Sequence, residues 1–261
     1  MEKLPYVLFA SPPIGPIALA ALEAANYPPV LTITDPKLSL EELIAQSEEV
    51  SPTFFLVVGF GAILKQTLLD VVAGQVLNIH PSLLPLYRGP APVIQAILDG
   101  ASETGVTLME IDVKMDHGPI LAQERIPLRG DEAPTELYQV LTVKGVALFL
   151  EHINDYLNEK LEPEPQNHLE ATITHFVKKE DGKLDFSLPA EQLERQIRAY
   201  QGWPGSYTTF NGKHLIVHKA HLENGVLRID EVQPAGGVRM SLQAFLAGQR
   251  TTPEAFYASL S

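Results

Sequence analysis

The chain has 261 residues, a formal net charge of −13 and no cysteine. Its length favours one large domain or two unequal ones, and its acidic balance is unlike that of most nucleic-acid-binding proteins. The lack of cysteine excludes disulfides, a thiolate metal site and a cysteine nucleophile. No apolar run reaches the roughly 18 residues of a membrane span, and the first apolar run is too short for a signal peptide, so we expect a cytoplasmic protein.

Short apolar or β-branched runs alternate with helix-like segments along the first part of the chain. The runs typical of strands are residues 6–10, 29–34, 53–60, 75–80 and 105–112. The segments typical of helices are residues 16–25, 39–49, 64–73, 90–100 and 133–159. Ser39, followed three positions later by Glu42, has the pattern of a capping box. This alternation predicts an α/β fold with an open, doubly wound, mostly parallel sheet.

The sequence changes character in its last third. Residues 160–176 are polar and contain prolines, which is typical of a connector, and residues 189–200 have the apolar spacing of a short helix. From Gly205 onward the pattern is β, and Asn211-Gly212 between two β runs is a strong hairpin signal. We predict an N-terminal domain over residues 1–165, a connector over 166–204 and a small β domain over 205–261.

Asn78 and His80 stand at the end of one strand-like run, directly before Pro81. Side chains alternate along a strand, so these two share a face, and the proline should end the strand because it cannot donate to the ladder. Ligands of open α/β sheets bind beyond the carboxyl ends of the strands. There a histidine suits proton transfer, and an asparagine amide can donate to an oxyanion. Taken alone, such a pair more often contains a histidine satisfied within a loop.

A second polar group lies in the stretch EIDVKMDHGPIL. Asp112 and Asp116 have the same strand parity, and the pattern up to Gly118 predicts a turn. A carboxylate near an imidazole fixes the tautomer of the ring and favours its charged form. Taken alone, these residues are more simply explained as solvated acids near a strand end.

Together the two stretches are much more specific. NIHPSLLPLYRGPAP followed by GVTLMEIDVKMDHGPIL resembles the folate-dependent formyltransferase family. Residues 198–220 and 231–248 resemble the connector and C-terminal domain of members that formylate tRNA. The resemblance covers nearly the whole chain. It implies a Rossmann-like catalytic domain of the formyltransferase type and a C-terminal β domain that resembles a reduced oligonucleotide-binding barrel.

The resemblance places the family's catalytic trio on Asn78, His80 and Asp116. It implies transfer of a formyl group from 10-formyltetrahydrofolate to the α-amine of methionine on the initiator tRNA, without a metal. Asn78 would steady the tetrahedral oxyanion, and His80 would relay the amine proton or help to stabilise the intermediate. Asp116 would orient His80 or a bridging water. The expected partner is therefore the methionyl initiator tRNA, and we expect a monomer.

The same resemblance assigns residues to the donor and acceptor sides. The predicted donor-binding residues are Phe60, Gly61, Ile63, Leu64, Ser82, Leu83, Leu84, Pro85, Asp112 and Gly118. The predicted acceptor-binding residues are Arg88, Lys213, Lys219 and Arg239. Residues 205–261 hold five Lys or Arg against four Asp or Glu, so they repel a polyanion less than the rest of this acidic chain does.

Two departures from the family's pattern concern the acceptor side. After the stretch TITDP the family carries a basic loop, a helix and another strand, whereas here the helix-like residues 39–49 follow almost directly. The family's sheet order places the missing strand at an edge, where its loss leaves the core pairs intact. The C-terminal domain is also short, so we do not expect a complete five-stranded barrel. The donor side keeps all its elements.

Three features leave alternatives open. His214, His218 and His221 lack a carboxylate at ligand spacing, which disfavours a metal site. Trp203 could stack on a base, although packing at a domain junction is the favoured interpretation. Arg88 could bind a phosphate of the tRNA or the glutamate tail of the folate, or it could make a structural contact in its turn.

The function also has rivals. A sugar-amine N-formyltransferase would use the same donor, and the LYRGPAP stretch and the C-terminal pattern argue against it. A glycinamide ribonucleotide formyltransferase needs no such C-terminal extension. A non-catalytic folate- or tRNA-binding homologue would have no need of all three catalytic residues.

Overall fold

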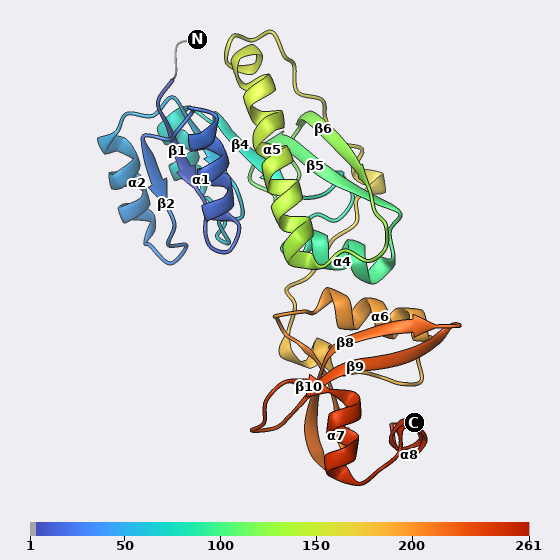
Figure 1. Cartoon of the computed structure of the whole chain (residues 1–261). Helices are drawn as coiled ribbons and strands as arrows, with labels where there is room; N and C mark the ends of the chain where they lie inside the picture. Colours follow the sequence, from blue (N-terminus) through green and yellow to red (C-terminus); the bar gives the residue numbers. More distant parts are fainter. Residues whose placement is uncertain (1–3, 261) are drawn as a thin grey trace. The chain divides into compact units, whose positions relative to one another are not determined.

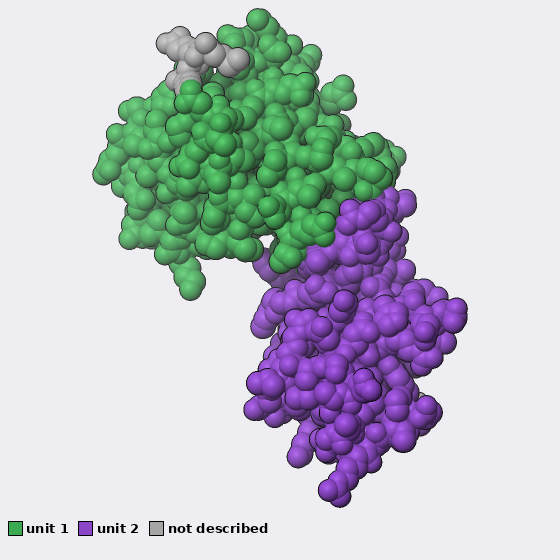
Figure 2. All heavy atoms as spheres, viewed as in Figure 1, with its two compact units in different colours: residues 1–92, 103–127, 135–175 green, residues 93–102, 128–134, 176–261 purple. Residues whose placement is uncertain are grey.

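The computed structural model describes residues 4–260, which form two compact units (Figure 2). Among these residues, unit 1 comprises the chain up to Pro92, Glu103–Pro127 and Thr135–His175, and unit 2 comprises Val93–Ser102, Leu128–Pro134 and the chain from Phe176 onward. Unit 2 thus includes two short excursions from the first half of the chain. The predicted segments 1–165, 166–204 and 205–261 stay a prediction.

Unit 1 contains a six-stranded sheet. In chain order the strands are β1 (Tyr6–Phe9), β2 (Leu31–Ile33), β3 (Phe54–Val57), β4 (Val76–His80), β5 (Glu103–Glu110) and β6 (Ile120–Pro127). Their spatial order is β2-β1-β3-β4-β5-β6, with parallel pairing from β2 to β4 and antiparallel pairing from β4 to β6. The predicted mostly parallel α/β sheet is confirmed. The antiparallel edge is an addition that is common in mixed sheets.

The helices follow the predicted segments, with changes in length. They are α1 (Gly15–Ala24), α2 (Leu40–Glu49), α3 (Gln66–Leu69) with the 3₁₀ turn Asp70–Val72, α4 (Pro92–Asp99) and α5 (Pro134–Leu157). The capping box of α2 is confirmed, because Ser39 and Glu42 bond to each other's backbone N–H groups. No helix among residues 4–260 is long and apolar enough to cross a membrane.

Helix α5 lies close against the sheet beside β4 and β5 (Figure 1). Gly145 allows this approach, because a Cβ atom at that position would lie 2.2 Å from Cγ2 of Ile79 and 2.9 Å from Cγ2 of Val106. Aromatic packing stabilises the sheet at β1 and β3. The ring of Phe9 packs edge-on against those of Phe55 and Phe60, with its centroid 5.0 and 5.2 Å from theirs. Such pairs contribute about 0.5–1.5 kcal/mol each beyond their burial. The carboxyl ends of β3 and β4 are therefore held rigidly.

Unit 2 is built on an antiparallel sheet of four strands in the order β10-β9-β8-β7. The strands are β7 (Ser206–Phe210), β8 (Lys213–Glu223), β9 (Val226–Pro234) and β10 (Met240–Ser241), and the helices are α6 (Ala190–Ala199), α7 (Leu242–Gln249) and α8 (Pro253–Ala258). The predicted hairpin is confirmed at Asn211 and Gly212, where φ is 49° and 72°. The sheet has fewer strands than a complete five-stranded barrel, as the short C-terminal sequence predicts.

The last helices of unit 2 were not predicted. Phe245 of α7 and Phe256 of α8 pack with Phe210 of β7 in one apolar cluster, with ring centroids 5.7 and 5.2 Å from that of Phe210. Leu193 and Ile197 of α6 belong to the same cluster. The core of the small domain is therefore completed by helices packed on its sheet.

Candidate active site

Asn78 and His80 lie at the carboxyl end of strand β4, on the side of the sheet where the parallel strands end. All five residues of β4 are buried, and the strand pairs with β3 on one side and β5 on the other. It ends at His80, before Pro81, as predicted. A strand that is hydrogen-bonded on both sides fixes the direction of its side chains, so both polar groups are held on a rigid element.

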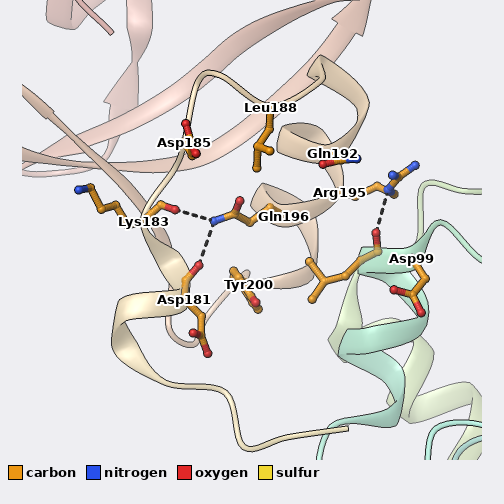
Figure 3. Close-up of a pocket in the computed structure, with 10 residues that line it drawn as sticks. Asp99, Asp181, Lys183, Asp185, Leu188, Gln192, Arg195, Gln196 and Tyr200 are labelled. Carbon is orange, nitrogen blue, oxygen red and sulfur yellow. Dashed lines mark hydrogen bonds between the residues drawn. The ribbon is translucent and has the colours of Figure 1, made fainter. Parts of the chain in front are cut away.

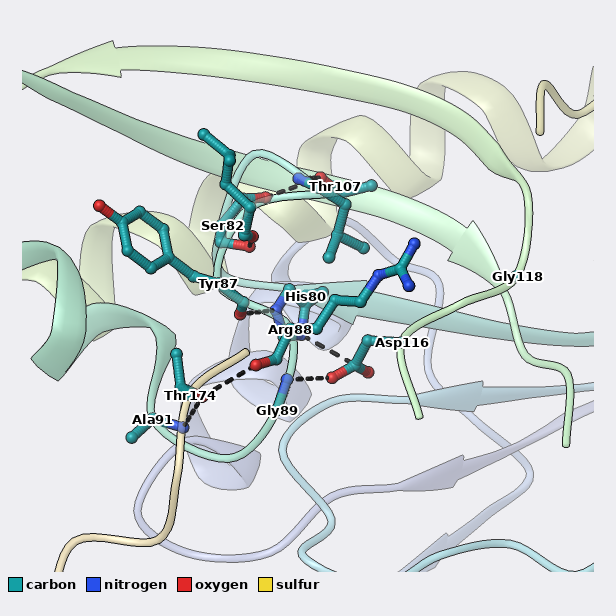
Figure 4. Close-up of polar contacts among 12 residues, drawn as sticks. His80, Ser82, Tyr87, Arg88, Gly89, Ala91, Thr107, Asp116, Gly118 and Thr174 are labelled. Atoms are coloured by element: carbon teal, nitrogen blue, oxygen red, sulfur yellow. Dashed lines mark hydrogen bonds and ion pairs between the residues drawn. The ribbon is translucent and has the colours of Figure 1, made fainter. Parts of the chain in front are cut away.

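The hydrogen bond of His80 defines its tautomer. The ring is 5% exposed, and its Nε2 lies 3.0 Å from the carbonyl oxygen of Tyr87 (Figure 4). A carbonyl can only accept, so Nε2 carries the hydrogen and donates it. In the neutral ring, Nδ1 is then the unprotonated nitrogen. It faces Asp116, whose Oδ1 lies 3.8 Å away. His80 therefore presents a proton acceptor next to a carboxylate.

Asp116 is held by the loop after β4, the same loop whose Tyr87 carbonyl bonds to His80. Its Oδ2 accepts a hydrogen bond of 2.7 Å from the backbone N–H of Gly89 (Figure 4). Its backbone is left-handed, with φ of 49°, which is uncommon for a residue with a side chain. The 3.8 Å between Oδ1 and Nδ1 of His80 is too long for a direct hydrogen bond. A nitrogen or a water oxygen can contact both atoms at once.

Asn78 is the member of the trio without a protein partner. The residue is 9% exposed, and its amide makes no hydrogen bond within residues 4–260. Within these residues only Thr104 Oγ1 is a fully enclosed side-chain polar atom without a partner, so solvent or a ligand can reach the Asn78 amide. The structure therefore brings two fixed groups, His80 and Asp116, into one unit with a third polar group that is available to a ligand.

The predicted donor element Ser82–Pro85 is buried and braced by its neighbours. The hydroxyl of Ser82 donates to the carbonyl of Leu86, and the hydroxyl of Thr107 donates to the carbonyl of Ser82. The amide of Gln123 on β6 donates to the carbonyl of Leu84 at 2.8 Å. Ser82, Leu83 and Leu84 are buried, so this element shapes the site mainly through its backbone.

The predicted folate-facing loop divides into anchors and an exposed tip. Phe60 and Leu64 are buried in the apolar core, whereas Ile63 is 80% exposed. Gly61, with φ of 77°, allows the turn between them. Ser11 was not predicted, and it donates from its hydroxyl to the carbonyl of Phe60 at 2.8 Å. The loop thus offers an apolar side chain on a fixed base.

Asp112 and Gly118 flank the loop that carries Asp116. Asp112 Oδ2 lies 2.6 Å from Nδ1 of His117, and the His117 ring stacks on His168 with centroids 3.9 Å apart. Partial desolvation and the nearby His117, Arg88 and Lys114 lower the pKa of His168. Gly118 is buried against the carbonyl of Glu110, where a Cβ atom would lie 2.2 Å from that oxygen.

The predicted acceptor residues lie in both units. Arg88 is only 7% exposed, and its guanidinium donates to Gln166 Oε1 and contacts Nδ1 of His168. Of the alternatives open for Arg88, the structure shows the structural contact. Lys213 and Lys219 are exposed on β8, and Arg239 forms an ion pair with Glu231.

A segment that the sequence predicted only as a connector contacts the site. The backbone around Ile173 pairs with Arg88: the Arg88 N–H donates to the Thr172 carbonyl at 2.9 Å, and the Thr174 N–H donates to the Arg88 carbonyl at 2.7 Å. Gly89 fits there because a Cβ atom would lie 2.7 Å from the Thr174 carbonyl oxygen. The alternating Thr-Ile-Thr pattern was the only local signal of this pairing.

The remaining polar clusters do not form a second catalytic arrangement. Within residues 4–260 no three His, Cys, Asp or Glu side chains are grouped to hold a metal. His218 contacts Gln233 and His221 contacts Asp230, and His214 stacks on Tyr207. Trp203 is 63% exposed.

Unit 2 also has a surface hollow of about 690 Å³ (Figure 3). Its lining residues are Leu98, Asp99, Asp181, Lys183, Asp185, Leu188, Gln192, Arg195, Gln196 and Tyr200. None of them is a predicted site residue. The amide of Gln196 is already bonded to the carbonyls of Asp181 and Lys183, and Arg195 to that of Leu98.

The sequence matches known families along most of its length. Residues 12–153 match the family described as formyl transferase, and residues 177–226 match the formyl transferase C-terminal domain. The chain belongs to the formyl transferase family. Methionyl-tRNA formyltransferase of Chloroflexus aurantiacus is 40% identical to this formyl transferase in an alignment 265 positions long. The alignment covers 89% of this chain and 82% of that one.

Solved structures agree with the fold of this formyl transferase. Methionyl-tRNA formyltransferase from Clostridium thermocellum superposes with a TM-score of 0.67 at 19% identity, covering 88% of this chain and 99% of that one. An N-formyltransferase from Helicobacter canadensis, in complex with folinic acid and dTDP-3-aminofucose, superposes with a TM-score of 0.64 at 22% identity, covering 86% and 89%. At such identities these matches show the fold alone.

Proposed function

We propose that this protein transfers the formyl group of 10-formyltetrahydrofolate to the α-amine of methionyl initiator tRNA. The observation that carries the proposal is the trio of Asn78 and His80 at the end of β4 with Asp116 from the loop between β5 and β6, in a chain 40% identical to a methionyl-tRNA formyltransferase over 89% of its length. The donor and the roles of individual residues are part of the proposal. It needs no metal.

His80 is suited to accept a proton from the attacking amine. Its Nε2–H is held by the Tyr87 carbonyl, so the unprotonated nitrogen is Nδ1. The amine nitrogen attacks the formyl carbon while a proton passes to Nδ1, and the same proton can then reach N10 of the folate as the C–N10 bond breaks. Asp116 stabilises the positive charge that the ring carries between these steps.

Asn78 supplies the group for the opposite charge. The formyl oxygen becomes an oxyanion in the tetrahedral intermediate, and an amide N–H donor stabilises it. The Asn78 carboxamide has no competing partner within residues 4–260 and does not have to break an existing protein hydrogen bond. This preorganisation is the reason to assign Asn78, rather than another nearby amide, to the oxyanion.

The donor side is proposed to use two structural types of contact. Ile63 offers an exposed apolar side chain in the same loop as the buried Phe60 and Leu64 and the turn residue Gly61. Ser82–Pro85 on one side and Asp112 to Gly118 on the other offer mainly backbone and carboxylate groups. An apolar surface with a few fixed polar groups is typical of sites for planar cofactors and co-substrates.

The acceptor side is proposed to rest on few charges. Lys213 and Lys219 are exposed cations of unit 2, and Arg239 is ion-paired with Glu231. Arg88 acts within the protein, because its guanidinium is buried and bonded to Gln166. We infer a small number of phosphate contacts, with recognition depending largely on the methionyl group and the acceptor end.

The test is a direct comparison of acceptors. The full chain is incubated with 10-formyltetrahydrofolate and either charged initiator tRNA or dTDP-linked amino sugars, and the formylated product is identified by mass spectrometry. Formylation of methionyl-tRNA is expected. Turnover of only the amino sugar would assign the protein to the sugar N-formyltransferases. The Helicobacter canadensis N-formyltransferase, whose structure contains dTDP-3-aminofucose, has a similar fold. Donor binding without turnover of either acceptor would identify a non-catalytic homologue.

A further inference from the structure

We propose that Gln166 is a positioning residue that holds Asp116 at its working distance from His80. The inference rests on the proposed function, because it assigns a task within that reaction. Gln166 lies in the segment that the sequence predicted as a connector, and it does not contact His80 itself. Gln166 positions Asp116 by hydrogen bonds to the backbone of the Asp116 loop and to the side chain of Arg88.

Both the amide nitrogen and the amide oxygen of Gln166 make hydrogen bonds, and the residue is only 5% exposed. The Nε2 group donates to two carbonyl oxygens of the Asp116 loop, that of Asp116 at 3.0 Å and that of Gly118 at 2.7 Å. The Oε1 atom accepts from Nε and Nη2 of Arg88, at 3.1 and 2.6 Å. An amide is the side-chain group that can accept at one end and donate twice at the other.

These bonds close a ring around the catalytic pair. Gln166 ties the Asp116 loop to Arg88, and Arg88 lies between Tyr87 and Gly89 in the chain. The Tyr87 carbonyl holds Nε2 of His80, and the Gly89 N–H holds Oδ2 of Asp116. The loop that fixes the tautomer of His80 is therefore the loop to which Gln166 ties Asp116.

The backbone of Asp116 needs such support. Its φ of 49° lies in a region that a side chain disfavours, so the conformation persists only where its surroundings enforce it. Without the Gln166 amide, the Gly118 carbonyl loses its donor in a buried position and the loop can relax. A carboxylate displaced by about 1 Å can lower a rate by up to about 10²-fold.

The simpler alternative is that Gln166 only satisfies the buried Arg88. Two substitutions separate these roles. Gln166→Met removes both ends at similar length. Gln166→Glu keeps the acceptor for Arg88 but places a carboxylate oxygen against the carbonyls of Asp116 and Gly118. If Gln166 acts through Asp116, both variants lose activity; if it serves only Arg88, Gln166→Glu restores it.

Unit 2 offers a control of the same residue type and donor pattern, though a more exposed one. Gln196 also donates through Nε2 to two carbonyl oxygens, those of Asp181 and Lys183, at 3.0 and 3.1 Å. Gln196→Met removes two exposed hydrogen bonds to carbonyl oxygens outside the unit that holds His80. It is expected to lower the melting temperature less than Gln166→Met does, and to leave kcat within about twofold of the parent, in line with the small effects of substitutions away from special sites.

The first readout is steady-state kinetics with saturating methionyl-tRNA. For Gln166→Met and Gln166→Glu we expect kcat to fall about tenfold or more, with the KM for the folate donor changed much less. Full kcat in Gln166→Met, or recovery of kcat in Gln166→Glu, would overturn the proposal.

The second readout does not depend on activity. Hydrogen exchange of the Gly89 N–H, measured by NMR, reports its bond to Asp116 Oδ2 directly. Gln166→Met is expected to speed exchange at Gly89 but not at Arg88, whose N–H donates to Thr172. Unchanged protection at Gly89 would refute the positioning role. If the parent protein formylates no acceptor, the proposed function fails, while the exchange data still decide whether Gln166 positions Asp116.

Discussion

Two buried polar side chains, Glu132 in unit 2 and Asn78 in unit 1, differ in their hydrogen bonding. In unit 2, the Glu132 carboxylate accepts from the N–H groups of Arg129 and Gly130, and Arg198 is bonded to Glu194 and to the Glu132 carbonyl. In unit 1, Asn78 is almost as buried but has no hydrogen-bond partner within residues 4–260. A side chain that bonds to the protein contributes to stability, whereas one that makes no bond to the protein contributes little and stays available to a ligand. The comparison predicts which substitutions affect activity and which affect stability.

The largest expected effect is at His80. In His80→Ala, turnover with methionyl-tRNA should fall by about 10²-fold or more, because the proton acceptor beside Asp116 is lost. Circular dichroism should show a folded protein, and His152→Ala, a histidine of α5 outside the site, should keep its activity. A folded His80→Ala protein with most of its activity would remove His80 from the mechanism.

Asn78 tests the comparison most directly. Asn78→Leu has nearly the same shape but no amide donor, so kcat should fall by about 10²-fold, as for loss of an oxyanion-stabilising group. Its melting temperature should change little, because the Asn78 amide makes no hydrogen bond within residues 4–260 that the substitution could remove. A large loss of stability in this variant would mean that the amide serves the fold.

The exposed cations of unit 2 should have intermediate effects. Replacing Lys213 and Lys219 together by alanine should raise the KM for tRNA severalfold and leave the KM for the folate donor unchanged. If the protein makes about two to four phosphate contacts, the log–log dependence of tRNA affinity on salt has a slope of about −2 to −4. The double variant should make it shallower by about 1 to 2.

Lys160→Ala, an exposed lysine of unit 1, serves as the matched control for these substitutions. It should change neither the KM for tRNA nor its salt dependence. A parental slope steeper than about −6 would reveal a basic surface that involves other residues.

The smallest expected effect is on stability in unit 2. Burial opposes ionisation of Glu132, but the hydrogen bonds from Arg129 and Gly130 outweigh it and lower the pKa of the carboxyl group. A lowered folded-state pKa adds stability above the unfolded-state pKa, and this stability is lost as the pH falls through the folded value. Glu132→Gln should therefore cost about 1 kcal/mol at neutral pH. Urea unfolding of both proteins should show the difference shrinking in acid, with kcat at neutral pH unchanged.

The sequence predicted those features that depend on local pattern. The end of β4 at His80 follows from Pro81, and the hairpin at Asn211-Gly212 follows from residues that tolerate positive φ. Both are local rules of backbone chemistry. The alternation of apolar runs and helices was sufficient for the parallel half of the sheet.

The features that the sequence did not predict depend on distant contacts. Strand β6 is half exposed, and its pairing with β5 is decided by the partner rather than by composition. Gln166 lies 50 residues from Asp116 and 78 from Arg88, in a stretch whose prolines and polar residues indicate a connector. Local patterns cannot show which loop such a segment meets. The trio is predicted only by the family resemblance, because each of its two stretches is ambiguous alone.

The short strand at the end of the sheet has a consequence for colloidal behaviour. The edge strands of an open sheet present unpaired backbone groups, to which another chain can add. Here one edge, β2, contains only the three residues Leu31–Ile33. The opposite edge, β6, carries Glu124 and Arg125, which are ion-paired with Lys144 and Glu103. Short and charged edges both discourage edge-to-edge association of sheets.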